Sequence, residues 1–315
     1  MQVSLKQLRY FAALADAGSF GRAAARVSVT QPALSLQIKE LESTLGARLI
    51  ERTRRDAKLT RAGQQVLARA RRILAEVGDL EQAARLSGGL SGRLHLGVIP
   101  TVAPYLLPAV LTDIRSQAPA LDLRVREAMT APLVELLLRG QLDAAIVALP
   151  VADAGVIAEP LFEDRFLLAG AAHDLARWHG AANGARPTQI TPDELLLLDE
   201  GHCLADQALE VCGMAQRQPM DLGASSLATL CGLAAQGFGM TLVPEIAAQA
   251  ETRAAPGLKL LRFDAPEPAR QVGLIRRASS ADEGWAHSLT DILRAAGQRL
   301  IDRARAAGDP AHGGP

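Results

Sequence analysis

A glycine-rich segment, Ser87-Gly88-Gly89-Leu90-Ser91-Gly92, divides this 315-residue chain into two parts with different sequence patterns. Before it, apolar residues recur at helical spacing, whereas after it strand-like and helix-like stretches alternate. Such a composition is typical of a linker, so we expect a domain boundary here. The formal net charge of zero hides an asymmetry, because residues 1–87 carry 15 Lys and Arg against 8 Asp and Glu. This net charge of +7 is typical of a nucleic-acid-binding module, and the remaining residues carry −7.

The basic segment is expected to form three short helices. Apolar residues recur at helical spacing over 5–15, 20–27 and 34–45, and the connections between these stretches are tight. Thr30 is the expected N-cap of the third helix, and Pro32 falls in its first turn, where a missing N–H has no cost. Three such helices are typical of a helix-turn-helix, whose last helix enters the major groove of DNA. A small helical bundle with no role in DNA binding is the alternative.

The same segment resembles the DNA-binding signature of the LysR family of transcriptional regulators. The resemblance is carried by Gly18-Ser19-Phe20, Ala23-Ala24, Thr30-Gln31-Pro32-Ala33-Leu34-Ser35, Ile38, Leu41-Glu42, Leu45-Gly46 and Leu49-Ile50-Glu51-Arg52. It implies that Gln31, Pro32 and Ser35 contact bases and that Lys39 is a further DNA-binding position. A glutamine can pair with adenine through two hydrogen bonds, whereas a proline offers only an apolar contact.

A run of cations follows the expected recognition helix. It consists of Arg52, Arg54, Arg55, Lys58 and Arg61, which lie within ten residues. A charge run is usually a solvated face. Directly after a recognition helix, however, we expect a wing whose cations contact phosphates or the minor groove. Arg52, Arg54 and Arg55 are therefore candidate DNA-binding residues.

Residues 61–86 contain no proline and carry a heptad seam. Its members, at alternating steps of four and three, are Val66, Ala70, Ile73, Val77, Leu80 and Ala84. The seam predicts a long helix that pairs with a second copy of the chain, because a dimer presents two helix-turn-helix units to one operator. A helix that packs on its own chain is the alternative.

We expect a winged helix-turn-helix domain over 1–62, a linker and dimerisation helix over 63–87, an α/β regulatory domain over 88–305 and a disordered tail over 306–315.

Beyond the linker, strands and helices are expected to alternate. Strands are predicted over 93–99, 121–128, 144–149, 166–170, 240–243 and 271–276, with helices around 104–117, 132–139 and 226–236. This alternation predicts two α/β subdomains with a parallel sheet and helices on both faces. Two subdomains joined by crossing strands resemble the periplasmic-binding-protein-like effector domain of LysR regulators. The resemblance implies a ligand crevice between them, at the carboxyl ends of strands.

Two of the three cysteines lie in Gly201-His202-Cys203-Leu204-Ala205-Asp206-Gln207-Ala208-Leu209-Glu210-Val211-Cys212. If residues 204–211 are helical, a rise of about 1.5 Å per residue places the two cysteine Cα atoms roughly 13 Å apart. A disulfide needs these atoms within about 7 Å, so bridging would require the segment to unfold. The spacing matches neither a C-x-x-C motif nor a zinc-ligand pair, and we expect no metal or cofactor. The alternative is that both are ordinary buried cysteines.

This segment resembles the sensor loop of peroxide-sensing transcription factors of the LysR family, which reads G-H-C-L-x-D-Q and is followed at this interval by a second cysteine. The resemblance implies that Cys203 attacks peroxide to form a sulfenic acid and that Cys212 resolves it to a disulfide. It implies further site residues, which bind or orient peroxide or assist the reacting cysteine: Thr101, Thr130, His202, Asp206, Gln207 and Arg270. Two positions depart from the family pattern: Asp221 stands where some members have a histidine, and Cys231 matches no sensor position, so we interpret Cys231 as a core residue.

Three functions are compatible with these patterns. They are a peroxide-sensing transcriptional activator, a LysR regulator that responds to a small metabolite, and a thiol peroxidase or oxidoreductase. The enzyme is disfavoured because a C-x-x-C motif is absent and a DNA-binding module is present. The resemblance implies operator DNA, hydrogen peroxide and RNA polymerase as partners, and self-association into dimers or tetramers. The N-terminus has no apolar h-region and no run approaches eighteen apolar residues, so we expect a cytoplasmic protein that does not enter membranes.

Overall fold

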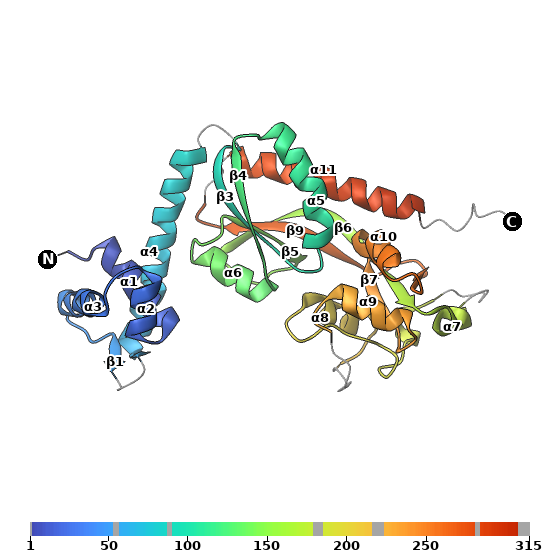
Figure 1. Ribbon diagram of the computed structural model, residues 1–315, viewed down its shortest axis with the longest axis horizontal. Coiled ribbons are helices and arrows are strands. Elements are labelled where there is room, and N and C mark those ends of the chain that lie inside the picture. Colours follow the sequence, from blue (N-terminus) through green and yellow to red (C-terminus); the bar gives the residue numbers. More distant parts are fainter. Residues whose placement is uncertain are drawn as a thin grey trace. The chain divides into compact units, whose positions relative to one another are not determined.

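The structure is a computed structural model that describes residues 2–52, 57–86, 90–178, 185–215, 224–280 and 284–307. The chain forms two compact units (Figure 1). The first comprises Met1–Ala84 with Leu138–Gln141, and the second comprises Arg85–Leu137 with Leu142–Pro315. No helix within the described residues is long and apolar enough to cross a membrane.

The first unit is a winged helix-turn-helix followed by a long helix. Its elements are α1 (Leu5–Ala17), α2 (Phe20–Arg26), α3 (Gln31–Leu45), β1 (Ile50–Arg52), β2 (Ala57–Leu59) and α4 (Arg61–Leu86). Thr30 caps α3 as predicted, and Ser19 caps α2 in the same way, because each hydroxyl accepts a hydrogen bond from a first-turn N–H group of its helix. Gly18 ends α1 in the left-handed conformation, with φ of 66°. Phe11, Leu14, Leu34, Ile38, Leu41 and Leu49 form its fully buried core.

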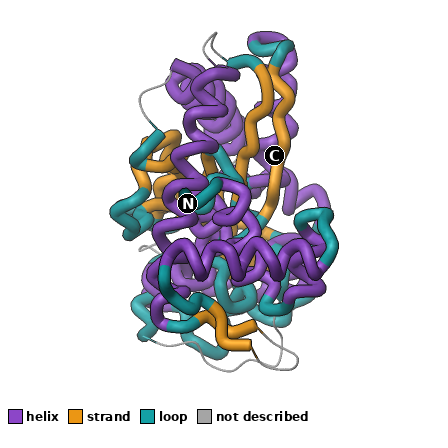
Figure 2. The backbone as a smooth tube through the Cα atoms, turned by 90° about the vertical axis from the view of Figure 1, so that its left-hand side faces the viewer, coloured by secondary structure: helices purple, strands orange, loops and turns teal. Residues whose placement is uncertain are grey.

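The two short strands pair antiparallel and form the predicted wing, which Figure 2 shows as short strands beside the helices of this unit. The carboxylate of Glu42 on α3 accepts hydrogen bonds from the backbone N–H groups of Leu49 and Ile50, at 2.8 and 3.2 Å. Thr60 caps α4, because its hydroxyl accepts a hydrogen bond from the N–H of Gly63 at 2.9 Å. The helix α4 is continuous, as its lack of proline predicts.

The second unit is built on a seven-stranded mixed sheet. Its strands are β3 (Gly92–Val98), β4 (Leu121–Glu127), β5 (Ala144–Leu149), β6 (Val156–Gly170), β7 (Thr241–Pro244), β8 (Lys259–Arg262) and β9 (Ala269–Arg277). The order is β4-β3-β5-β9-β6-β7, with β8 also paired to β6. Among the seven described strands of this sheet, only β3, β4 and β5 pair in parallel, so the predicted parallel sheet is wrong beyond β5.

The physical reason lies in β6 and β9, which both connect the two subdomains. The strand β6 is 15 residues long, not the five predicted, and it pairs with β9 through its first part and with β7 and β8 through its last part. One of these strands carries the chain into the second subdomain and the other brings it back. They therefore run antiparallel, whatever the local sequence pattern.

Helices cover both subdomains of this unit. They are α5 (Ala103–Gln117), α6 (Thr130–Leu138), α7 (Ala172–Leu175), α8 (Cys203–Val211), α9 (Leu227–Ala235), α10 (Glu245–Ala254) and α11 (Gly284–Ala307), with 3-10 turns at Ala176–Trp178 and Pro187–Gln189. Figure 1 shows α5 and α11 on one face of the strands of the first subdomain and α6 on the other. Each subdomain has its own apolar core. The helix α11 continues through Ala307, two residues into the predicted tail, and the rest of that tail lies outside the described residues.

Candidate functional site

The predicted DNA-binding positions on α3 lie on its solvent-facing side. Gln31, Pro32 and Lys39 are exposed and Ser35 is half-buried, whereas the opposite side of the helix is buried in the core. The spacing of 31, 35 and 39 places these residues one above the other along the helix. Two of the predicted wing contacts, Arg54 and Arg55, lie outside the described residues. For Arg52 only the backbone is described.

A cavity of about 510 Å³ lies between the two subdomains of the second unit, beside the first residue of α8. It is lined by Thr130, Ala148, Leu149, Pro150, Phe166, Cys203, Asp206, Gln207, Glu210, Val211, Pro268, Ala269, Arg270 and Gln271. Five of the predicted site residues, Thr130, Cys203, Asp206, Gln207 and Arg270, are thus brought to one cavity from three separate segments of the chain, α6, α8 and β9. Three predicted residues do not line the cavity. His202 is the buried N-cap of α8 and Thr101 bonds to Arg270, so both adjoin the cavity, whereas Cys212 lies at the opposite end of α8.

Two buried polar atoms of this cavity have no hydrogen-bond partner among the described residues. They are the hydroxyl oxygen of Thr130, at the start of α6, and the side-chain carbonyl oxygen of Gln207, on α8. A buried polar group without a partner costs about 1–3 kcal/mol, so native proteins rarely leave one unused. A small polar ligand with both donor and acceptor atoms would satisfy them.

Arg270 is held in one orientation by a fully buried ion pair. Its Nε and Nη2 donate to one carboxylate oxygen of Asp164, at 3.0 and 2.9 Å, and both side chains are fully buried. Its Nη1 donates to the hydroxyl of Thr101 at 2.8 Å, and Nη2 also donates to the Thr101 carbonyl at 3.1 Å. Burial raises the pKa of Asp164, while the Arg270 guanidinium and the backbone N–H of Ile246 act in the opposite direction. Sequence reasoning missed Asp164, because it precedes the predicted strand over 166–170 and stands between Glu163 and Arg165, in a charged run typical of an exposed segment.

The three cysteines are free and occupy different environments. Cys203 is half-buried at the N-terminal end of α8, and it packs against the core of the first subdomain. Cys212 caps the other end of α8 in the core of the second subdomain, where burial raises the pKa of its thiol to about 11. Cys231 is fully buried, as interpreted from the sequence, and burial followed by the nearby Glu251 raises its pKa.

The predicted helix between Cys203 and Cys212 is confirmed, and it is continuous from Cys203 to Val211. At about 1.5 Å of rise per residue, the two Cα atoms are roughly 13 Å apart, beyond the reach of a disulfide. The segment after Cys212 is described only as far as Ala215, so Asp221 lies outside the described residues. No group of three or more His, Cys, Asp or Glu within the described residues could hold a metal ion.

Comparison with known families assigns both units. Residues 5–64 match the bacterial regulatory helix-turn-helix protein, lysR family, and residues 87–298 match the LysR substrate binding domain. The chain belongs to the LysR family of transcriptional regulators. This LysR regulator is 43% identical over 298 residues to a probable hydrogen peroxide-inducible genes activator of Streptomyces viridosporus, across 94% of the chain and 95% of the relative.

Solved structures of the regulator OxyR share the fold of this LysR protein. A full-length OxyR variant from Pseudomonas aeruginosa aligns with a TM-score of 0.72 at 33% identity, covering 93% of this chain and 98% of the other. An OxyR mutant from Corynebacterium glutamicum with hydrogen peroxide bound aligns with a TM-score of 0.65 at 34% identity, covering 98% and 97%. The predicted fold class, a winged helix-turn-helix and a two-subdomain α/β effector domain, is confirmed.

Proposed function

We propose that this LysR regulator is a transcriptional activator that senses hydrogen peroxide by oxidation of Cys203. One observation carries the proposal: a half-buried cysteine at a helix N-terminus shares a cavity with two buried, unpartnered polar atoms, on Thr130 and Gln207. Hydrogen peroxide can both donate and accept hydrogen bonds and is small enough to reach them. The relatives named for hydrogen peroxide support the same assignment.

The chemistry requires two steps and no cofactor. The Cys203 thiolate attacks one peroxide oxygen, the O–O bond breaks, and the departing hydroxide takes a proton to leave as water, so Cys203 becomes a sulfenic acid. The Cys212 thiolate then attacks the Cys203 sulfur, and a second water leaves as the disulfide forms. Two thiols have lost two electrons to one peroxide. In the first step His202, Asp206 and Gln207, with Thr101 and Thr130, orient the peroxide and polarise the departing oxygen.

Arg270 contributes to the first step through its hydrogen bond to Thr101 and through its positive charge. Its bond to the Thr101 hydroxyl uses that oxygen as an acceptor, which leaves the hydroxyl proton free to be donated into the site. The buried guanidinium also places a positive charge on the wall of the cavity that Cys203 shares. A positive charge there stabilises the thiolate and the departing hydroxide.

The second step makes the sensor a conformational switch. Cys212 cannot reach Cys203 while α8 is folded, and its raised pKa keeps the thiol protonated in the core. The helix must therefore unfold, which exposes Cys212 to solvent and lets it ionise. Because α8 contributes buried residues to the second core, the disulfide form must repack that subdomain.

The DNA-binding unit is proposed to act as a dimer on operator DNA. Gln31, Pro32 and Ser35 on α3 would meet base edges, with Lys39, Arg52, Arg54 and Arg55 as further DNA contacts. Two members of the α4 seam support pairing with a second copy, because Ile73 is 46% and Leu80 is 71% exposed on this unit, whereas the earlier members Val66 and Ala70 pack in the unit's own core. Further association into tetramers and contact with RNA polymerase belong to the same proposal.

The experiment that tests peroxide sensing is a count of free thiols before and after stoichiometric hydrogen peroxide. The proposal expects two thiols to be lost, and peptide mapping should find one bridge between Cys203 and Cys212. Cys203→Ser should abolish the loss and Cys231→Ser should leave it unchanged. A bridge to Cys231, or no peroxide-dependent bridge, would reject the proposal in favour of a LysR regulator that binds a metabolite between the subdomains.

A further inference from the structure

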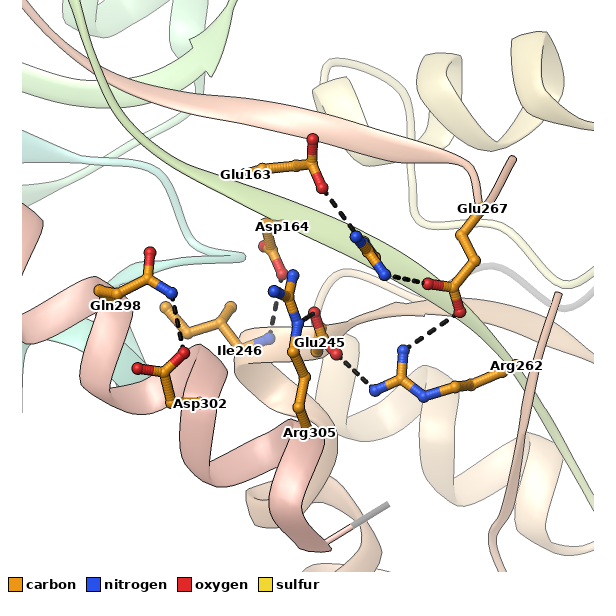
Figure 3. A network of polar contacts seen from close by, with 10 residues as sticks. Glu163, Asp164, Glu245, Ile246, Arg262, Glu267, Gln298, Asp302 and Arg305 are labelled. Carbon is orange, nitrogen blue, oxygen red and sulfur yellow. Dashed lines mark hydrogen bonds and ion pairs between the residues drawn. The ribbon is translucent and has the colours of Figure 1, made fainter. Parts of the chain in front are cut away.

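The helix α10 is anchored at its N-terminal end to the buried ion pair of the candidate site. The backbone N–H of Ile246 donates to Asp164 at 3.0 Å, through the carboxylate oxygen that Arg270 leaves free. Next to it, the fully buried carboxylate of Glu245 pairs with Arg262 at 2.5 Å and Arg305 at 3.1 Å. Figure 3 shows Asp164, Arg262 and Arg305 reaching the start of the helix from β6, β8 and α11. This end of α10 therefore has little freedom to move.

The other end of α10 is bonded to the first subdomain. Glu251 is only 5% exposed, and one of its carboxylate oxygens accepts a hydrogen bond of 2.6 Å from the hydroxyl of Tyr105 on α5. Burial, followed by this hydrogen bond, raises the pKa of Tyr105 far above its usual range, so the phenol stays a donor at any physiological pH. No catalytic step assigned above uses either residue.

Tyr105 lies in the first turn of α5, four residues after Thr101. Thr101 lies inside a tight turn, because the carbonyl of Ile99 accepts the N–H groups of Val102 and Ala103, both at 3.0 Å. The N–H of Tyr105 in turn donates to the Val102 carbonyl at 3.2 Å. Thr101 itself is bonded to Arg270, Arg270 to Asp164, and Asp164 to the start of α10. The contacts thus form a closed ring that passes through both subdomains and includes one proposed peroxide ligand.

We propose that Glu251 is a positioning residue for the peroxide site and that it acts through Tyr105 to hold Thr101 in place. The inference rests on the proposed peroxide-sensing function. The ring fixes Thr101 from two sides, by Arg270 through its side chain and by Tyr105 through the backbone turn. Without the bond to Glu251, the half-buried Tyr105 hydroxyl shifts to find another acceptor, and the turn that carries Thr101 shifts with it. Misplacement of a ligating group by about 1 Å can lower a reaction rate by roughly a hundredfold.

The test compares two reactions of Cys203 in the full-length protein. Oxidation by hydrogen peroxide depends on Thr101, whereas alkylation by iodoacetamide needs only an accessible thiolate. We expect Tyr105→Phe and Glu251→Ala to lower the second-order rate of oxidation by roughly ten- to a hundredfold. Their rate of alkylation should stay at the wild-type value. Glu251→Gln should oxidise at nearly the wild-type rate, because its amide carbonyl still accepts the hydrogen bond from Tyr105.

Thr252→Val is the matched control. It removes the hydrogen bond from the Thr252 hydroxyl to the Ala248 carbonyl on the same helix, at 2.8 Å, without touching the ring, and it should react normally. Equal losses of oxidation and alkylation, or unfolding of Tyr105→Phe, would show a merely structural role and overturn the inference. So would wild-type oxidation rates in Tyr105→Phe and Glu251→Ala. Failure of the wild type itself to oxidise at Cys203 would instead reject the proposed function.

Discussion

If the disulfide forms only after α8 unfolds, a mutation that weakens this helix should accelerate the second step of oxidation and leave the first unchanged. Ala208→Gly is suitable, because Ala208 lies in the middle of α8, is 3% exposed and does not line the cavity that holds Cys203. Glycine inside a helix costs about 0.5–1 kcal/mol relative to alanine. Loss of the buried methyl group costs about 0.8 kcal/mol more.

The two effects together destabilise the folded helix by about 1.5 kcal/mol, which raises the population of the open form about tenfold. The rate at which Cys212 resolves the sulfenic acid should rise by the same factor. The two steps are measured separately. Trapping with dimedone follows the formation of the sulfenic acid, and non-reducing peptide mapping over time follows the formation of the disulfide. Hydrogen exchange of residues 203–211 measures helix opening independently.

Ala234→Gly on α9 is the control, since Ala234 is also fully buried in the second subdomain but lies outside the segment that must unfold. It should lower overall stability without accelerating resolution. The reasoning would be refuted if Ala208→Gly increased hydrogen exchange in α8 while the disulfide formed at the wild-type rate. A disulfide form in which residues 203–211 remained protected from exchange would refute it equally.

Three further predictions follow from other parts of the structure. Gln31→Ala should reduce discrimination between operator and random DNA by roughly 1–3 kcal/mol in binding titrations, and equal weakening on both would exclude a role in base readout. Asp164→Asn should lower the free energy of unfolding in urea by roughly 3–5 kcal/mol, because Arg270 stays buried without its counter-charge; a loss below about 1 kcal/mol would contradict this. Iodoacetamide at pH 8 should modify Cys203 and spare Cys212. Burial raises the pKa of the Cys212 thiol to about 11 in the folded state. The stability that the protonated thiol contributes is therefore complete below the ordinary thiol pKa and is lost as the pH rises toward about 11. Labelling of Cys212 should begin in that pH range.

Much of the local structure is determined by short stretches of sequence. Ser19, Thr30 and Gly18 set the ends of the helices in the DNA-binding unit, because a capping side chain or a left-handed glycine acts on N–H and C=O groups only a few residues away. The helix α8 follows for the same reason. Its geometry already required that Cys203 and Cys212 be separated before oxidation.

Only the tertiary structure decided which distant residues meet. The sequence pattern predicted a parallel sheet, but the paths of β6 and β9 between subdomains made it mixed. Asp164 and Thr101 are 106 and 169 residues from Arg270, and Tyr105 is 146 residues from Glu251. Such pairs carry no local signature, because periodicity reports which face of an element is buried and not what lies against it. The interaction between two such partners becomes strong only once the chain has folded and removed both of them from water. For that reason the sequence motif predicted the site residues but not the ring of contacts that supports them.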